Sequence, residues 1–206
     1  KELFMKIQHI HGLPPLYTNT FLITTDAGHG ILIDAAAAPE TYLDALKAEN
    51  ATLTHILLTH GHYDHVGAVA ALKQATGCTV YMDPVDAAGT QLLPLKSGQV
   101  DKNWPANNEL NIDGLTFKIY HTPGHTQGSV VLNCGNLLFS GDTLFAGSCG
   151  RTDMPGGRCR KACPCWPTCL WATTPRSCRG TRASPPSGRS AAPTPTWTAA
   201  GPTKPS

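Results

Sequence analysis

The run from Thr59 to Gly67 places three histidines and one aspartate within a few residues, directly after the apolar segment 55–58. That segment predicts a buried strand, and alternate residues at the end of a strand point their side chains to the same side. Imidazoles and a carboxylate that converge in this way are typical of a metal site. The alternative is a solvated turn that is rich in histidine by chance. It is disfavoured because unpaired polar groups at the end of a buried strand cost roughly 1–3 kcal/mol each unless something binds them.

Two further segments place metal-ligand residue types directly after a predicted strand. The run 115–120 is followed by His121-Thr122-Pro123-Gly124-His125-Thr126, and the run 136–139 is followed by Ser140-Gly141-Asp142-Thr143. A glycine before Asp142 would let the backbone come close to a metal centre. We therefore expect His125 and Asp142 to join the residues of the first motif.

The order HxHxDH, HTPGHT and SGDTLF resembles the metallo-β-lactamase fold superfamily, and the block GSCGRTDMPGG at 147–157 resembles the short glyoxalase II-type hydrolases. The resemblance implies an α/β protein, an αββα sandwich. It also implies two divalent metal ions, with zinc expected and iron or manganese as alternatives. The implied ligands are His60, His62 and His125 for the first ion, Asp64 and His65 for the second, and Asp142 as a bridge. In the family a final histidine completes the second site, and no histidine follows His125 here, so we expect that site to be weakened.

The same resemblance implies a metal-dependent hydrolase, a thioesterase that acts on hydroxyacyl-glutathione or a related thioester. Paired metal ions lower the pKa of a shared water from about 15.7 to near 7, which supplies a metal-bound hydroxide as nucleophile. Asp64 would orient that hydroxide, and a thiolate leaving group needs little help from a general acid. Two alternatives remain. One is a non-haem iron persulfide dioxygenase, whose family shares the HTPGHT and GRTD-type motifs, and the other is a catalytically defective product. A β-lactam or lactone substrate suits the fold, although the GRTD block argues against it.

The composition changes near residue 157. Residues 1–157 contain all 14 acidic residues and 8 of the 16 basic ones, whereas 158–206 contain the other 8 basic residues, nine prolines, five of the eight cysteines and a single leucine. Such a segment can bury little apolar surface. We expect 1–157 to form a metallo-hydrolase domain, a truncated αββα sandwich, and 158–206 to be a disordered tail. A Cys-rich zinc module is the alternative, but the cysteines lack paired C-x-x-C spacing.

An out-of-frame C-terminus explains this tail. A shifted reading of G+C-rich codons for 176–181 can give Val-Leu-Pro-Gly-His, the motif that the family places last. The same shift across 190–198 can give Arg-Arg-Thr-Asn-Pro-Tyr-Leu-Asp, which resembles the closing segment of these hydrolases. The sequence therefore predicts a slip of frame near Gly157.

Strand-like and helix-like segments alternate in the first part of the chain, which predicts sheets flanked by helices. The predicted strands are 21–24, 31–34, 55–58, 79–82, 115–120 and 136–139. The predicted helices begin at Pro39, with Tyr42, Leu43 and Leu46 on one face, and at Val66, ending before Gly77. Residues 83–108 lack clear periodicity and predict a loop beside the site.

Several other residues have structural interpretations. Asp34 ends a predicted strand and is expected to hydrogen-bond a ligand histidine. Arg151 and Asp153 are expected to form a structural pair, with Arg151 as a clamp for a substrate carboxylate as the alternative. Isolated cysteines are expected to be buried, and histidines outside the motifs to be ordinary surface or core residues. These are Cys78, Cys134 and Cys149, and His9, His11, His29, His55 and His121.

Neither part of the chain contains 18 consecutive apolar residues or a signal-like segment. We therefore expect a cytoplasmic enzyme with a small-molecule thioester substrate and with neither a nucleic acid nor a membrane as partner. The sequence gives no indication of the oligomeric state.

Overall fold

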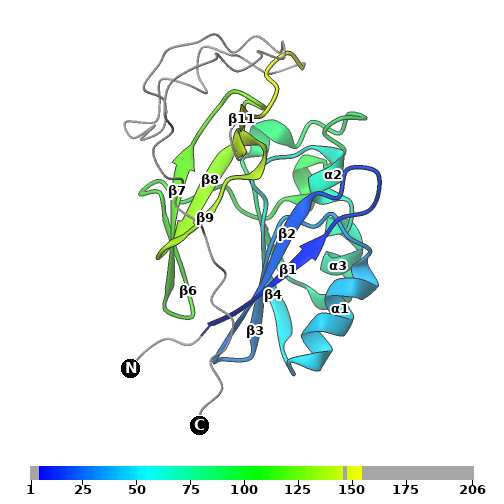
Figure 1. Ribbon diagram of the computed structural model, residues 1–206, viewed down its shortest axis with the longest axis vertical. Helices are drawn as coiled ribbons and strands as arrows, with labels where there is room; N and C mark the ends of the chain where they lie inside the picture. The colour runs from blue at the N-terminus through cyan, green and yellow to red at the C-terminus, as the bar shows by residue number, and fades with distance from the viewer. Residues whose placement is uncertain (1–4, 146–147, 155–206) are drawn as a thin grey trace, which may run out of the picture. The chain divides into compact units, whose positions relative to one another are not determined.

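The computed structural model describes residues 5–145 and 148–154, which form two β-sheets packed face to face (Figure 1). The first sheet has the strand order β1-β2-β3-β4-β5, with β1 (Met5–His11), β2 (Asn19–Thr25), β3 (His29–Ile33), β4 (Thr52–Leu57) and β5 (Thr79–Tyr81). The second has the order β6-β7-β8-β9, with β6 (Glu109–Ile112), β7 (Leu115–His121), β8 (Val130–Cys134) and β9 (Leu137–Phe139). A two-stranded hairpin follows, formed by β10 (Leu144–Phe145) and β11 (Ser148–Cys149).

The helices lie against the first sheet. α1 (Pro39–Ala48) connects β3 to β4, and α2 (Tyr63–Val66) and α3 (Val69–Thr76) lie between β4 and β5. β3 pairs with β4, and β4 with β5, in the parallel direction, so each connection must cross over one face of the sheet. Three 3₁₀ turns complete the set: η1 (Pro84–Asp86), η2 (Ser97–Gln99) and η3 (Gly141–Thr143). Within the described ranges, no helix is long and apolar enough to cross a membrane.

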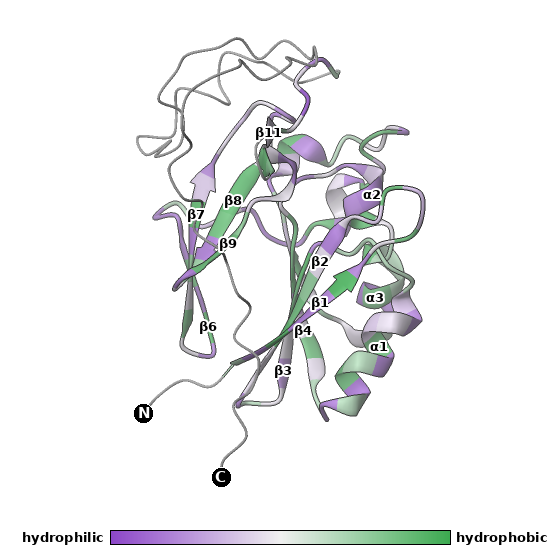
Figure 2. Ribbon diagram, in the orientation of Figure 1, coloured by the Kyte–Doolittle hydropathy of each residue, from purple (hydrophilic) through white to green (hydrophobic). Residues whose placement is uncertain are grey.

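Two apolar cores hold these layers together, and β3 contributes to both. Leu32 packs with Tyr42 and the other helix residues in the first core, whereas Ile31 and Ile33 pack with Phe117 between the sheets. This division follows from the alternation of side chains along a strand. A strand buried on both faces is apolar almost throughout, as β8 also is (Figure 2).

The predicted α/β sandwich is confirmed, with one correction to its helices. All six predicted strands are present, and Pro39 begins a helix that buries Tyr42 and Leu46. The helix predicted from Val66 is wrong at its start, because the chain forms α2, breaks, and begins α3 at Val69. The break occurs because the N–H of Ala68 donates to the carbonyl of Ala35 in the loop after β3.

Some elements were not predicted, and one predicted segment lies outside the described residues. β1, β6, β8 and the β10–β11 hairpin have no counterpart among the predicted strands. The tail 158–206 lies outside the described part of the chain, as does residue 157, where the slip of frame was expected. Of the four layers in an αββα sandwich, the described residues supply one helical layer and both sheets.

Replacing Tyr42 by phenylalanine should lower the free energy of unfolding by about 1–3 kcal/mol. The Tyr42 hydroxyl is buried, accepts the Ala37 N–H at 2.9 Å and lies 2.9 Å from the Thr20 hydroxyl. The substitution leaves the Ala37 N–H without its acceptor in a dry core. Denaturant unfolding would measure the loss. The matched control is Tyr63→Phe at a half-exposed ring, which should stay within about 0.5 kcal/mol of the parent.

Candidate metal centre

The six predicted ligands come from connections that follow β4, β7 and β9, so both sheets contribute to one site. The loop after β4 and the short helix α2 supply His60, His62, Asp64 and His65, the β7–β8 connection supplies His125, and η3 supplies Asp142.

Three buried imidazoles form the first group. The Nδ1 atom of His62 lies 3.1 Å from Nε2 of His60 and 2.8 Å from Nε2 of His125. Nitrogens bound to one tetrahedral zinc ion at about 2.0–2.1 Å would lie roughly 3.3 Å apart. The three rings are at most 5% exposed, and their ligand atoms lie within 4.8 Å of one another. The histidine cluster therefore fits a metal site.

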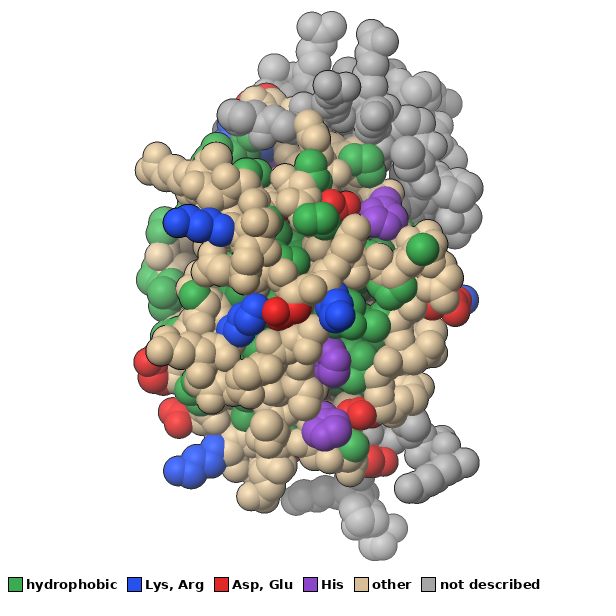
Figure 3. Space-filling model, turned by 180° about the vertical axis from the view of Figure 1, so that it is seen from behind, with side chains coloured by type: hydrophobic (Ala, Val, Ile, Leu, Met, Phe, Trp, Pro, Cys, Tyr) green, Lys and Arg blue, Asp and Glu red, His purple; other side chains and the backbone are tan. Residues whose placement is uncertain are grey.

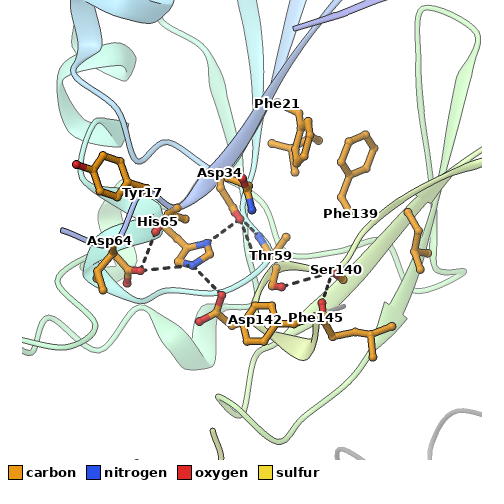
Figure 4. A pocket seen from close by; sticks show the side chains of 17 residues that line it. Tyr17, Phe21, Asp34, Thr59, Asp64, His65, Phe139, Ser140, Asp142 and Phe145 are labelled. Atoms are coloured by element: carbon orange, nitrogen blue, oxygen red, sulfur yellow. Dashed lines mark hydrogen bonds and ion pairs between the residues drawn. The ribbon is translucent and has the colours of Figure 1, made fainter. Parts of the chain in front are cut away.

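A second group, formed by Asp64 and His65, lies beside Asp142 (Figure 4), and Asp142 connects it to the first group. One Asp142 oxygen is 3.3 Å from Nε2 of His65, and the other is 3.3 Å from Nε2 of His125. Nε2 of His65 is buried and, apart from its ion-pair contacts with Asp142 and Asp64, makes no hydrogen bond in the described part of the chain. A metal ion bound between these atoms would satisfy it. Asp64 is less close, with its Oδ2 atom 3.7 Å from the same nitrogen.

Protonation differs between the two groups. Burial and the neighbouring rings hold the pKa of His60 well below its ordinary value, and burial together with His125 lowers the pKa of His62 to about 4. Neutral imidazole is the form that binds metals. For His65, burial alone would lower the pKa, but Asp34 and Asp142 raise it to about 10. His65 is therefore protonated near neutral pH in the metal-free protein, and a metal ion that bound to its Nε2 atom would have to displace that proton.

Asp34 holds His65 from the side opposite to Asp142. Its Oδ2 atom accepts from His65 Nδ1 and from the Thr59 hydroxyl, and its Oδ1 atom accepts from the Thr59 N–H, each at 2.8 Å. The hydrogen bond expected from the sequence is therefore present. The structure gives a further reason for glycine at position 141. A Cβ at Gly141 would overlap the Thr59 side chain, and φ is +46°.

Two further contacts orient ligands, and the sequence indicated neither of them. The Thr18 hydroxyl donates to Asp64 Oδ2 at 2.9 Å. His125 Nδ1 donates to the carbonyl of Arg151 at 2.8 Å. The Arg151 side chain instead forms the expected pair with Asp153, at 2.8 and 3.0 Å, on the surface. Arg151 therefore touches the site through its backbone.

A cavity of about 440 Å³ opens beside the second group. Asp64, His65 and Asp142 form part of its wall, together with Asp34 and Thr59 (Figure 4). The apolar part of the lining is Leu16, Tyr17, Phe21, Ile33, Leu138, Phe139, Leu144 and Phe145. A small molecule in this cavity would contact the residues of the second group directly.

Comparison with known families agrees with this geometry. Residues 13–166 match the model of the metallo-beta-lactamase superfamily. The chain belongs to this superfamily. Metallo-beta-lactamase proteins are generally hydrolases and bind divalent metals, which is what the histidine cluster fits.

Individual relatives carry more specific names. The chain is 42% identical over 130 residues to a hydroxyacylglutathione hydrolase of Rhodopseudomonas palustris, which covers 62% of this chain and 48% of that protein. It is 33% identical over 153 residues to hydroxyacylglutathione hydrolase GloC of Haemophilus influenzae, covering 68% and 72%. The chain thus spans about half the length of the first relative and nearly three quarters of the second.

Solved structures show the same metallo-beta-lactamase fold. The B3 metallo-beta-lactamase BLEG-1 superposes with a TM-score of 0.68 at 31% identity, over 76% of this chain and 81% of that one. ETHE1 from Myxococcus xanthus gives 0.65 at 28%, over 76% and 66%. TTHA1623, in a di-iron-bound form, gives 0.61 at 33%, over 75% and 81%.

The remaining histidines and the three described cysteines belong to neither group of potential metal ligands. Histidine side chains on the outer surface are visible in Figure 3, and His29 forms an ion pair with Asp113 at 2.9 Å. Cys78 and Cys134 are buried as predicted, but Cys149 is exposed. That prediction was wrong because β11 pairs only with the two-residue strand β10 within the described ranges.

The metal-free protein should be most stable near pH 6.5. Because the pKa of His62 falls from 6.5 to about 4 on folding, the unfolded chain binds the extra proton, and stability is lost as the pH falls from 6.5 through 4. His65 acts in the opposite sense. Its raised pKa gives stability that is complete below 6.5 and is lost as the pH rises through about 10. Denaturant unfolding in the presence of a chelator, measured across this pH range, tests both effects. His62→Asn should reduce the loss of stability on the acid side without abolishing it, because the pKa of His60 is also lowered, and should leave the alkaline side unchanged.

Proposed function

We propose that this chain is a metal-dependent thioesterase of the glyoxalase II kind, which hydrolyses hydroxyacyl-glutathione or a related thioester. The observation that carries the proposal is a pair of adjacent groups of potential metal ligands, connected by Asp142, of which the second forms part of the wall of a cavity. The similarity to two hydroxyacylglutathione hydrolases supports this choice of substrate class.

The proposed metal ligands are those of the sequence analysis. His60, His62 and His125 would hold the first ion, Asp64 and His65 the second, and Asp142 both. Zinc is the proposed metal, and the di-iron form of one structural relative keeps iron as an alternative. We expect the second ion to bind less tightly, because its group has fewer imidazoles and must release the His65 proton.

Bound divalent ions would supply a hydroxide near neutral pH and polarise the thioester carbonyl. The protein's own contribution is orientation. Thr18 fixes one oxygen of Asp64, which leaves the other oxygen free to accept a hydrogen bond from the nucleophile. Asp34 holds the His65 ring by Nδ1 and directs its Nε2 toward Asp142. The apolar wall of the cavity limits the access of bulk water to the reacting carbonyl.

A non-haem iron persulfide dioxygenase is the second candidate, which the similarity to ETHE1 supports. It would use the same ligand residues with one iron ion, and it would consume oxygen. A β-lactam substrate is the third, which the similarity to BLEG-1 supports. The three candidates differ in what they consume and in which metal supports the activity.

Titration of the metal-free protein with zinc should show one tight and one weaker ion, with thioester hydrolysis low until zinc is in excess. Hydroxyacyl-glutathione, glutathione persulfide and a chromogenic cephalosporin would be offered to zinc-loaded and iron-loaded samples. Hydrolysis of the thioester with zinc, without oxygen uptake, is the expected result. Oxygen uptake with the persulfide in the iron-loaded sample alone would reassign the function to the dioxygenase. Turnover of none of the three compounds would favour the catalytically defective product.

A further inference from the structure

Asp86 is a buried carboxylate in the segment that follows β5. It ends the turn η1 and is 1% exposed. The hydrogen-bond donors to its carboxylate within the described residues are uncharged: two backbone N–H groups and one hydroxyl. A buried carboxylate needs such donors to offset the loss of water.

These donors belong to the two loops that carry the three histidines of the first group. Oδ2 of Asp86 accepts from the N–H of Gly61 at 3.1 Å, and Gly61 lies between His60 and His62. The same oxygen accepts from the hydroxyl of Thr126 at 2.6 Å, and Thr126 follows His125. Oδ1 accepts from the N–H of Gly128 at 3.0 Å. One side chain therefore ties the loop after β4 to the β7–β8 connection.

Packing around Asp86 is as close as its hydrogen bonds. A Cβ at Gly61 would lie 2.7 Å from the Asp86 carbonyl oxygen and 2.9 Å from its Cβ. A Cβ at Gly128 would lie 2.7 Å from the Asp86 carboxyl carbon. Both loops reach the carboxylate only because these two positions are glycine.

We propose that Asp86 is a positioning residue that sets the spacing between His125 and the His60–His62 pair, and so determines how well the first metal ion is held. It acts through the loops and touches neither the ion nor a substrate. The inference rests on the metal centre of the proposed function, but it requires no particular substrate.

The test is the Asp86→Asn variant. Asparagine has the same shape as aspartate, but its NH₂ group replaces one carboxylate oxygen and would face a hydrogen-bond donor instead of accepting from it. We expect zinc affinity at the first site, measured by chelator competition, to fall about 10–100-fold. The visible spectrum of Co²⁺ at that site should change, because it reports ligand geometry. In the metal-free protein, amide exchange at Gly61 and Gly128 should become faster. Asp101→Asn is the matched control, since that carboxylate also accepts a backbone N–H, from Val80, and contacts no ligand loop.

A second pair of variants covers the case in which Asp86→Asn does not fold. Thr126→Ser retains the hydroxyl that donates to Asp86 and should keep zinc affinity, whereas Thr126→Val removes it and should lower affinity. Affinity and Co²⁺ spectra that are equal for Asp86→Asn and Asp101→Asn, or equal for Thr126→Val and Thr126→Ser, would overturn the inference. Because all of these readouts are made without substrate, failure of thioester hydrolysis would count against the proposed function alone.

Discussion

Replacing His62 by alanine should reduce the metal content of the protein to less than one ion per chain and reduce hydrolysis to the background rate. His62 is central to the first group, because its Nδ1 atom lies within about 3 Å of a nitrogen of both other imidazoles. Its loss leaves two nitrogens for the first ion. The measurements are metal analysis after dialysis and a thioester assay on the same sample.

His121→Ala is the matched control for this prediction. His121 lies four residues before His125 in the same motif, but its ring is exposed and contacts Asn108 and Asp83. The variant should keep its metal and its activity. A His62→Ala protein with undiminished metal content would show that the three imidazoles do not form the principal site.

Replacing Asp34 by asparagine should lower the free energy of unfolding by about 3–5 kcal/mol, because it removes one partner of a buried ion pair. Asp34 and His65 are each 3% exposed and lie 2.8 Å apart. Asparagine is the informative substitution, since Asp34 has a φ of 57°, a region that asparagine tolerates and alanine does not. The variant should also bind the second metal ion more weakly, as His65 loses the group that fixes its ring.

The β6–β7 turn provides a closely matched control. Asp113 also has a positive φ, at 51°, and also pairs with Nδ1 of a histidine, His29, at 2.9 Å. Those side chains are 20% and 43% exposed, and exposed pairs contribute about 0–1 kcal/mol. Asp113→Asn should therefore cost far less than Asp34→Asn in denaturant unfolding. An equal decrease in the free energy of unfolding for both variants would mean that burial does not increase the contribution of the Asp34–His65 pair to stability.

The part of the site that could be predicted from the sequence is the part encoded locally. His60, His62 and Asp64 follow one strand within a few residues, and HTPGHT and SGDT each follow another. The geometry of strands then places such residues at a common edge. The structure brings the residues of the three motifs together. It also shows that Asp142 lies between His65 of the second group and His125 of the first.

The part that could not be predicted depends on contacts between distant segments. Asp86 meets its loops across 25 to 42 residues, and Thr18 meets Asp64 across 46. Nothing in the residues around Asp86 distinguishes it from a polar residue of an irregular loop. β1 was missed for a related reason, since it is an edge strand with exposed polar residues whose strand character depends on pairing with β2. The break before α3 likewise depends on a tertiary hydrogen bond.

The two loops that Asp86 ties together also have a consequence for chain entropy. His62 and His125 are 63 residues apart and lie in connections that follow strands of different sheets. An ion held by both would close a long loop in the way that a removable cross-link does. A cross-link of this kind lowers the conformational entropy of the unfolded chain and so favours the folded state. A ligand that binds only the folded form adds about 2.7 kcal/mol at one hundred times its dissociation constant. The melting temperature of a chain that holds such an ion would therefore depend on the concentration of free metal, and a cell that limits its supply of the ion would also lower the stability of the folded chain.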